Sequence, residues 1–372
     1  MATLTKASYE WARRKPDEKY ETVEACHAVA KADKDSSKVA YAALDSLRVE
    51  ANEGDLMLMP RKSNIPAYFT AQSFYMLCLQ LEAPAKFLQE HLPATLAAQV
   101  LNHQLAKQKN DSLSQLYFHN GDKMKLFGIN TEKYTRIYDA DILQHLINLK
   151  QTNGWHEAPA AFDNSRGIYR SYGDMFCFMV DNERRIFEKD PNGGLSRGFF
   201  VWNSEIGWRS FGLQTFNYEW VCGNHRVWGA KNIVEVKVRH IGTADERYFN
   251  AVQVELKKYA DSSSEETELQ VAEAKKFVIA KEKKDVIEAI FSRHIAGLNR
   301  KLITDGYDRA DAHVDWYGAP NTVWGICGGL TEIARDEANG EQRYNIERAS
   351  SKVMAMAIGE RAAKDQVIEI TV

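Results

Sequence analysis

Aromatic and arginine side chains interleave through the centre of the chain, between residues 166 and 240. Single-stranded nucleic acid is held by rings that stack on its bases and by cations that pair with its phosphates. The candidates for phosphate contacts are five arginines, and the candidate stacking rings are two tryptophans: Arg166, Arg170, Arg197, Arg209, Arg226, Trp202 and Trp208. This pattern predicts a nucleic-acid-binding face in the centre of the chain.

A plain hydrophobic core explains the same aromatic residues without any ligand. Rings at strand spacing pack as core and as cross-strand pairs. From residue 161 to residue 240 there are 11 Lys and Arg against 9 Asp and Glu, so the cationic excess is only two. Both interpretations stay open at this point: a core alone, and a core that carries a nucleic-acid face.

One pair of residues suggests metal-dependent nuclease chemistry. Glu235 and Lys237 share one face of an alternating strand, and in such enzymes the carboxylate holds Mg²⁺ while the lysine stabilises charge. That chemistry also needs an Asp from a neighbouring strand, and residues 191–234 contain no Asp. Alternating charges therefore fit the solvated face of a strand better than an active site.

Other catalytic and cofactor motifs are missing from the sequence. There is no P-loop, no Gly-rich dinucleotide fingerprint and no second His for a zincin helix. Ser171 resembles a nucleophile elbow, but Tyr169 occupies the position of the first glycine. His240 is in phase with the valines of its strand, which is typical of an inward-facing His. We therefore expect no cofactor, no metal site and, on balance, no enzyme.

The overall composition excludes the extremes of charge. The chain has 372 residues, and 48 Lys and Arg against 51 Asp and Glu give a net charge of −3. This is neither a basic nucleic-acid coat nor an acidic mimic, although a local basic groove remains open. Five cysteines without a C-x-x-C pair predict buried, reduced thiols.

No segment of the sequence predicts export or membrane insertion. Residues 1–19 lack the apolar core of a secretory signal. The most apolar stretch, residues 69–81, is broken by Gln72, Ser73 and Gln80, and it falls short of the roughly 20 residues that span a bilayer. The stretch therefore predicts a buried helix. Without a signal or a membrane span, we expect a protein of the host cytoplasm that contacts no membrane.

The order of patterns predicts an α+β fold with a central antiparallel sheet, flanked by N-terminal helices and a C-terminal helical part. Residues 1–55 are polar and predict a loosely held arm or short helices. Residues 56–242 form the α+β core, with the sheet from about 116 to 240. Residues 243–372 form a helical part packed on that core.

Within these parts the expected elements are a strand at 56–59, helices at 70–82 and 94–106, and a hairpin around Asn120 and Gly121. A helix at 140–150 and strands at 169–180, 198–203 and 233–240 follow. The apolar phase slips near Thr215, which predicts a β-bulge. Asp305 and Gly306 end the C-terminal helical run, and two closing helices follow at 323–335 and 346–363.

Several short motifs, in their order along the chain, resemble a phage- and plasmid-related family of unknown function, DUF932. They are residues 126–137 (LFGINTEKYTRI), 201–204 (VWNS), 220–224 (WVCGN), 238–243 (VRHIGT), 321–324 (NTVW), 330–332 (LTE) and 347–348 (ER). Upstream, residues 84–88 and 102–103 match the opening helices, so the resemblance covers about 56–363. Ile241 departs from the family pattern, which has Thr there.

The resemblance implies no activity, because the family has none agreed, and no catalytic residue is carried over. It marks recurring polar residues: Asn203, Ser204, Asn224, Arg239 and His240. These residue types are equally common in turns and structural hydrogen bonds and in functional sites. The sequence leaves open whether they lie close together in the fold.

Taken together, these patterns predict a phage-encoded, non-enzymatic protein that associates with single-stranded nucleic acid in replication or recombination, as a homo-oligomer. The first alternative is a structural or host-inhibiting protein that binds a phage or host protein partner. The second is the metal-dependent nuclease centred on Glu235 and Lys237.

Overall fold

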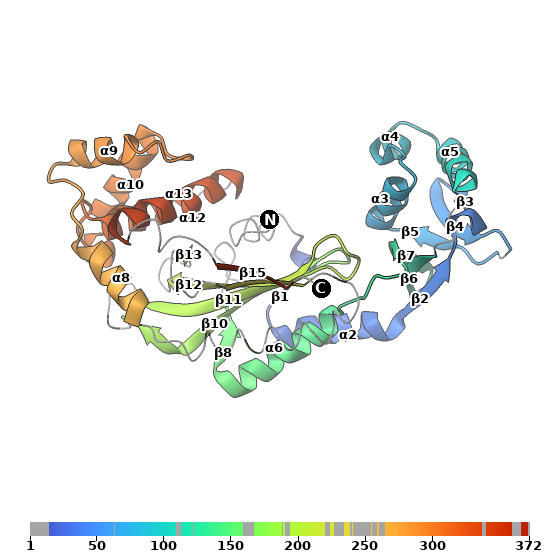
Figure 1. The fold of residues 1–372 in the computed structure, drawn as a ribbon, viewed down its shortest axis with the longest axis horizontal. Helices are drawn as coiled ribbons and strands as arrows, with labels where there is room; N and C mark the ends of the chain where they lie inside the picture. Colours follow the sequence, from blue (N-terminus) through green and yellow to red (C-terminus); the bar gives the residue numbers. More distant parts are fainter. Residues whose placement is uncertain are drawn as a thin grey trace.

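The computed structural model of the chain describes residues 15–62, 64–108, 113–120, 122–158, 167–187, 189, 194–219, 224–226, 234–238, 240, 254, 259, 265–336, 340–358 and 366–370. The fold is α+β, as the sequence predicts. Two sheets and a group of helices lie in a row, with the larger sheet in the middle (Figure 1). The term "N-terminal lobe" is used below for residues 37–131, and "C-terminal lobe" for residues 265–358.

The central sheet has the strand order β1-β9-β10-β11-β12-β14-β15, with β8 beside β10 and β13 beside β12. Its strands are β1 (Lys19–Tyr20), β8 (Trp155–Glu157), β9 (Ile168–Arg170), β10 (Met175–Ile186), β11 (Leu195–Asn203), β12 (Phe211–Glu219), β13 (Asn224–Arg226), β14 (Val234–Val238) and β15 (Gln366–Ile370). Described neighbours pair antiparallel except β14 and β15, which run parallel. The strands expected at 198–203 and 233–240 are therefore confirmed, whereas the single strand expected at 169–180 is two antiparallel strands, β9 and β10, joined by a tight turn.

Both faces of the central sheet are buried, and this accounts for its continuous apolar runs. One face packs on α2 (Val23–Ser36) and α6 (Asp139–Asn153) through residues such as Cys177 and Val201. The opposite face buries aromatic rings, among them Phe178 and Phe200. The expected β-bulge near Thr215 is wrong, because β11 and β12 pair without a register shift. A sheet buried on both faces needs no extra residue where the apolar phase changes.

The N-terminal lobe is a second sheet with the order β2-β6-β7-β5-β4-β3. Its strands are β2 (Ser37–Ala42), β3 (Leu47–Asn52), β4 (Asp55–Pro60), β5 (Ala67–Phe69), β6 (Ser114–Asn120) and β7 (Met124–Thr131). Helices α3 (Ala71–Gln80), α4 (Ala85–Glu90) and α5 (Ala94–Lys107) pack on it. The α3 helix begins at a capping box between Thr70 and Ser73, which satisfies two backbone donors.

The domain boundaries predicted from the sequence need correction. Residues 1–55 are not a loose arm throughout, because α2, β2 and β3 are ordered, and α2 and β3 bury apolar side chains such as Cys26 and Val49. The boundary at 55/56 falls inside the β3–β4 hairpin. The Asn120 hairpin forms as expected but belongs to the second sheet. Local alternation predicts a strand without specifying which sheet it joins.

The C-terminal lobe is helical, as expected, and consists of α8 (Glu265–Lys276), α9 (Lys283–Phe291), α10 (Arg300–Ala312), α11 (Val314–Tyr317), α12 (Val323–Asp336) and α13 (Gly340–Ile358). Gly306 does not end a helix but lies inside α10. A side chain there would collide with Leu330, and one at Gly329 would collide with the Gly306 carbonyl. Glycine therefore serves close helix packing here. After the lobe, β15 returns to the central sheet, which the sequence did not predict.

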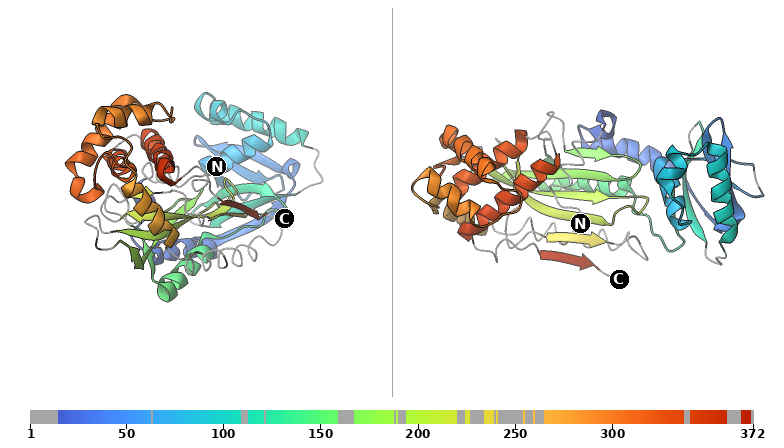
Figure 2. Two further views of the ribbon diagram at one scale, coloured as in Figure 1. Left: turned by 60° about the vertical axis from the view of Figure 1, so that its left-hand side comes forward. Right: turned by 90° about the horizontal axis from the view of Figure 1, so that it is seen from above.

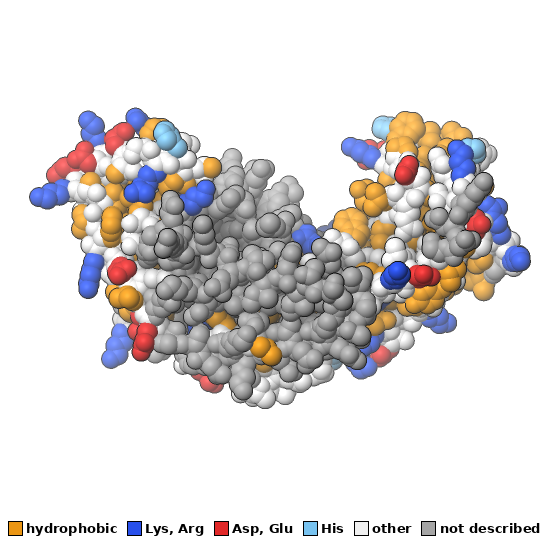
Figure 3. All heavy atoms as spheres, in the orientation of Figure 1, with side chains coloured by type: hydrophobic (Ala, Val, Ile, Leu, Met, Phe, Trp, Pro, Cys, Tyr) orange, Lys and Arg blue, Asp and Glu red, His pale blue; other side chains and the backbone are white. Residues whose placement is uncertain are grey.

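The two lobes rise at opposite ends of the central sheet, and the views in Figure 2 agree on this order. The outline of the space-filling view is hollowed between them (Figure 3).

Cys26, Cys78, Cys177 and Cys327 are free and buried, so the thiol prediction is confirmed for these four. None of the described helices is long and apolar enough to cross a membrane.

Candidate functional site

The chain segment after β11 ties the central sheet to its surroundings. Asn203 is fully buried, and its Nδ2 donates to the Ile137 carbonyl and to Oδ1 of Asp139, both at 2.8 Å. Ser204 Oγ donates to the Gly173 carbonyl at 2.6 Å and accepts from the Trp208 backbone N–H at 3.0 Å. These bonds fix the β9–β10 and β11–β12 turns against each other.

Glu205 lies next in the chain and receives hydrogen bonds from two other elements. Its carboxylate accepts from the Tyr117 hydroxyl of β6 at 3.0 Å and from the Asp139 backbone N–H at 2.8 Å. The Asp139 N–H is a first-turn donor of α6, which has no partner within its own helix. Glu205 therefore links the N-terminal lobe to the helix under the central sheet.

Arg170 lies in the middle of these acids. Its Nε donates to Asp139 Oδ2 at 2.9 Å, Nη1 donates to Asp33, and Nη2 lies 3.7 Å from Glu205. Burial, reinforced by the Glu205 carboxylate, raises the pKa of Asp139 to about 7. The attraction of Arg170 opposes that rise and keeps the carboxylates together in a site that excludes water.

Arg136 provides a second buried cation. It donates to the backbone carbonyl of Glu205 and to Gln115 Oε1, the latter at 2.9 Å. Its guanidinium also lies 3.5 Å from the ring centroid of Tyr117, a close cation–π contact. Two buried arginines thus lie at this junction, of which Arg170 pairs with the carboxylates of Asp139 and Glu205 and Arg136 binds the Glu205 backbone.

We call this cluster the polar joint; all of its members are buried: Tyr117, Arg136, Asp139, Arg170, Asn203 and Glu205. It connects β6 of the N-terminal lobe with α6, β9 and the end of β11. Charges taken out of water need compensation by partners, and here each ion has at least one opposite charge or hydrogen bond. The polar joint is a structural fastening between two sheets.

His240 extends the polar joint on one side. Its Nδ1 lies 3.0 Å from the Tyr134 hydroxyl, and the two rings stack with centroids 5.2 Å apart. The same hydroxyl donates toward the Ser204 carbonyl at 3.1 Å. Burial lowers the pKa of His240 to about 4, so the imidazole is neutral at pH 7. Three of the recurring family residues, Asn203, Ser204 and His240, therefore converge.

Three exposed aromatic rings lie on segments that meet at this junction, and we call them the aromatic rim. Tyr75 of α3, Tyr172 of the β9–β10 turn and Trp208 of the β11–β12 turn expose 50%, 52% and 53% of their surface. The ring centroids of Tyr75 and Trp208 are 5.9 Å apart. The Tyr172 ring packs on buried Phe127, with the two ring centroids 4.4 Å apart. The rim thus takes one ring from each of three segments that are far apart in sequence.

The turns that carry the rim are rigidly held. Ser171 Oγ accepts from the backbone N–H groups of Gly173 and Asp174 at 3.2 and 3.3 Å. Arg209 Nε lies 3.5 Å from the Asp174 carboxylate, and its guanidinium is 5.3 Å from the Phe176 ring. Arg209 is half-buried, so it places a cation at the edge of the same turn.

The structure corrects two of the predicted nucleic-acid contacts. Arg170 cannot reach a phosphate because it is buried in the polar joint. Trp202 is 1% exposed, and a side chain at Gly212 would overlap its ring. It is therefore a core ring rather than a stacking platform. The interleaved pattern places rings and arginines in the right region but does not separate the inside from the outside.

The remaining predicted residues are spread along the sheet. Arg197 is half-buried, and its Nη1 donates to the Tyr259 carbonyl at 2.8 Å, five positions along β11 from Trp202. Five residues of strand cover roughly 17 Å, so Arg197 is separate from the rim. Asn224 and Arg226 lie on β13, but their side chains are outside the described residues, as are Arg166 and Arg239 altogether.

Two rim residues were missed from the sequence. The helix that contains Tyr75 was expected to be buried, but Tyr75 and Leu79 lie on its exposed side. Tyr172 belonged to the interleaved pattern without being selected. Its signal is the polar turn around it, since rings on turns are exposed more readily than rings inside strands. Among the described residues, no three His, Cys, Asp or Glu side chains cluster as a metal site.

Comparison with known proteins gives one match. The model of a family described as "Domain of unknown function (DUF932)" matches residues 126–364. The chain belongs to this family. The match begins in β7, later than the 56 expected from the motifs, so most of the N-terminal lobe precedes the DUF932 region. No curated protein and no solved structure matches the chain.

Proposed function

We propose that this DUF932 protein binds single-stranded nucleic acid on the aromatic rim and performs no chemistry on the strand. The observation that supports this most is the contact of Tyr75 with Trp208, each about half exposed, with half-exposed Tyr172 on the β9–β10 turn that Ser204 ties to the Trp208 turn. Stacking of an unpaired base on such a ring is worth about 1–3 kcal/mol. A role in replication or recombination of a phage would use this activity.

Preorganisation of the rim supports the proposal further. Trp208 and Tyr172 sit on turns that share Ser204 as a hydrogen-bonding centre, and Asn203 and Glu205 of the polar joint flank Ser204 in the chain. Rings that are already fixed lose little conformational entropy when a ligand binds. A base therefore meets platforms that need no rearrangement.

Charge contributes less than stacking to the proposed binding. Arg209 is the predicted cation that lies at the rim, and Asp174 compensates part of its charge at 3.5 Å. An ion pair of this kind weakens the field that a phosphate experiences. We therefore expect the affinity to depend only moderately on salt and to fall sharply when a ring is removed.

A second candidate function has an observation of its own. Helices α3, α4 and α5 expose several large apolar side chains, which are Tyr75, Leu79, Phe87 and Leu96 (Figure 3). Contiguous exposed apolar surface is typical of protein–protein contact. This favours the structural or host-inhibiting alternative if the protein fails to bind nucleic acid. No comparable observation favours the nuclease, because the side chains of Glu235 and Lys237 lie outside the described residues.

Fluorescence anisotropy with a labelled oligonucleotide tests the proposal. The protein, sized by light scattering, is titrated against single strands and against the matching duplex at two salt concentrations. We expect binding to single strands, and a Trp208→Ala variant should bind roughly 5- to 150-fold more weakly, the equivalent of one stacked base.

Trp316→Ala is the matched control. Trp316 is also partly exposed, but it lies on α11 of the C-terminal lobe, stacked on His313. Its loss should leave the affinity unchanged. Equal affinity for duplex and single strand, or a Trp208→Ala variant that binds like the wild type, would contradict the proposed function.

A further inference from the structure

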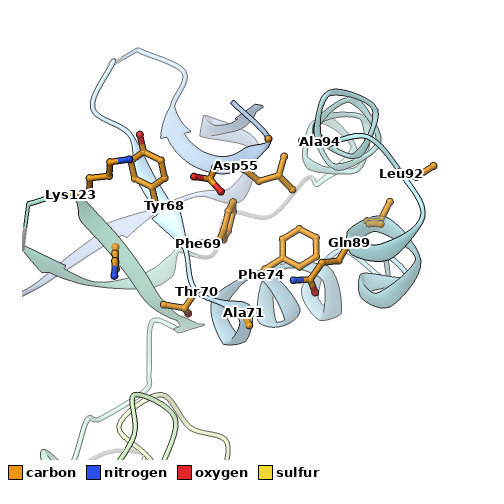
Figure 4. Close-up of a pocket in the computed structure, with 14 residues that line it drawn as sticks. Asp55, Tyr68, Phe69, Thr70, Ala71, Phe74, Gln89, Leu92, Ala94 and Lys123 are labelled. Carbon is orange, nitrogen blue, oxygen red and sulfur yellow. The ribbon is translucent and has the colours of Figure 1, made fainter. Parts of the chain in front are cut away.

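The N-terminal lobe contains a pocket of about 400 Å³ that the rim does not use (Figure 4). It opens where β4 and β7 begin and β5 ends, and helices α3 and α4 close its other side. Tyr68, Phe69 and Phe74 supply rings to its wall, and the Phe69 and Phe74 rings meet edge to face at 5.8 Å. Its volume lies within the range of small-molecule sites, about 300–1,000 Å³.

Polar groups of complementary kinds line the same pocket. Lys123 and Lys125 stand on the β7 side, and the ammonium of Lys123 lies 4.7 Å from the centre of the Tyr68 ring. Asp55 enters from β4 and Gln89 from α4 (Figure 4). The two lysines and Asp55 are the charged residues that line it, which gives a net charge of +1.

We infer that this pocket binds a nucleotide. A nucleotide combines the three properties that the pocket can recognise: a flat ring, a polar ring edge and an anionic phosphate. Its base would lie against Tyr68 and Phe69, and its phosphate would pair with Lys123 and Lys125. The Asp55 carboxylate accepts hydrogen bonds only, so it selects bases with an amino group, such as cytosine, over thymine.

The pocket and the rim are separate sites on neighbouring parts of one helix. Ala71 lines the pocket and Tyr75 belongs to the rim, about 6 Å apart along the axis of α3. Every residue that lines the pocket precedes residue 126, where the family match begins. The nucleotide site is thus a property of this chain's N-terminal lobe, and it does not depend on the proposed function of the rim.

Isothermal titration calorimetry of the full chain with 5′-dCMP tests this inference. Deoxycytidine, inorganic phosphate and dTMP serve as partial ligands. We expect dCMP to bind roughly 10-fold or more tightly than either deoxycytidine or phosphate, because a charge-assisted hydrogen bond is lost in each comparison. The double variant Lys123→Ala, Lys125→Ala should reduce dCMP binding to the level of deoxycytidine.

Two further variants make the result specific. Asp55→Asn should remove the preference for dCMP over dTMP, and Lys107→Ala, an exposed lysine at the end of α5, should change nothing. Phosphate binding as tightly as dCMP would reveal a simple anion site, and no dCMP binding at millimolar concentration would overturn the inference. Trp208→Ala should leave dCMP binding intact, so failure of the rim and failure of the pocket are distinguishable.

Discussion

Two tryptophans six residues apart on one hairpin have opposite environments. Trp202 lies inside β11 and is 1% exposed, whereas Trp208 lies on the following turn and is 53% exposed. The same contrast separates two arginines. Arg170 is enclosed by carboxylates in the polar joint, and Arg209 lies half-buried beside Asp174 at the rim.

The contrast shows that residue type alone does not decide between core and surface. Trp202 is covered because its strand lies in the middle of a sheet whose two faces are both buried. Trp208 is exposed because the turn carries it beyond the last paired residue, where Ser204 holds its backbone. The polar joint therefore stabilises the fold, and the rim remains available for a ligand.

The largest difference in stability between the polar joint and the rim should appear when Arg170 and Arg209 are each replaced by alanine. Arg170→Ala leaves Asp139 and Glu205 buried without their shared cation, and breaking a buried ion pair in this way costs about 3–5 kcal/mol. Arg209→Ala removes a partly exposed pair worth at most about 1 kcal/mol. Urea denaturation followed by circular dichroism measures both. Equal losses in the two variants would mean that the joint does not carry the stability assigned to it.

The two tryptophans allow the same comparison of buried and exposed positions with uncharged side chains. Trp202→Ala leaves a cavity against Gly212 and Phe200, and such changes cost about 3–5 kcal/mol. Trp208→Ala should shift the free energy of unfolding by less than about 1 kcal/mol, because half of its surface is already in water. A Trp208→Ala variant as unstable as Trp202→Ala would show that the rim is part of the core.

Much of the fold follows from local patterns in the sequence. The capping box at Thr70, the hairpin at Asn120 and the alternation of β14 are signals within a few residues of one another. Local patterns do not predict which distant segments pair. No pattern near β15 indicates that it pairs with β14, and none near Asn120 indicates that its hairpin joins β2 rather than β10.

The candidate site was predictable to the same extent. Ser204, His240, Trp208 and Arg209 were selected from sequence, and the structure brings them to one junction. Tyr75 and Glu205 were not, because each acquires its place only when the N-terminal lobe docks on the central sheet. A residue whose partner lies more than 80 positions away carries no signal in its own neighbourhood.

The pH dependence of stability should separate the joint from the rim more finely. The pKa of Asp139 rises from its ordinary value of 3.8 to about 7 in the folded chain. Between these values the folded state keeps a proton that the unfolded state releases, so stability falls as the pH rises. The stabilisation is complete below about pH 4 and is lost as the pH passes 7.

Asp139→Asn isolates this effect because an amide cannot titrate. The free energy of unfolding of the wild type, minus that of Asp139→Asn, should decrease between pH 5 and pH 8. The corresponding difference for Trp208→Ala should stay constant, since no titrating group is removed. A constant difference for Asp139→Asn would mean that Arg170 holds the carboxylate ionised throughout this range.

The smallest expected effect concerns the rim cation. If a phosphate contacts Arg209, its removal should lower the slope of log affinity against log salt by about 0.7, the value for one contact on a single strand. Trp208→Ala should lower the affinity and keep the slope, because stacking releases no counterion. Anisotropy titrations at several salt concentrations measure both. If the salt slope is unchanged in Arg209→Ala, the Arg209 guanidinium pairs with Asp174 rather than with a phosphate, and stacking alone holds the strand.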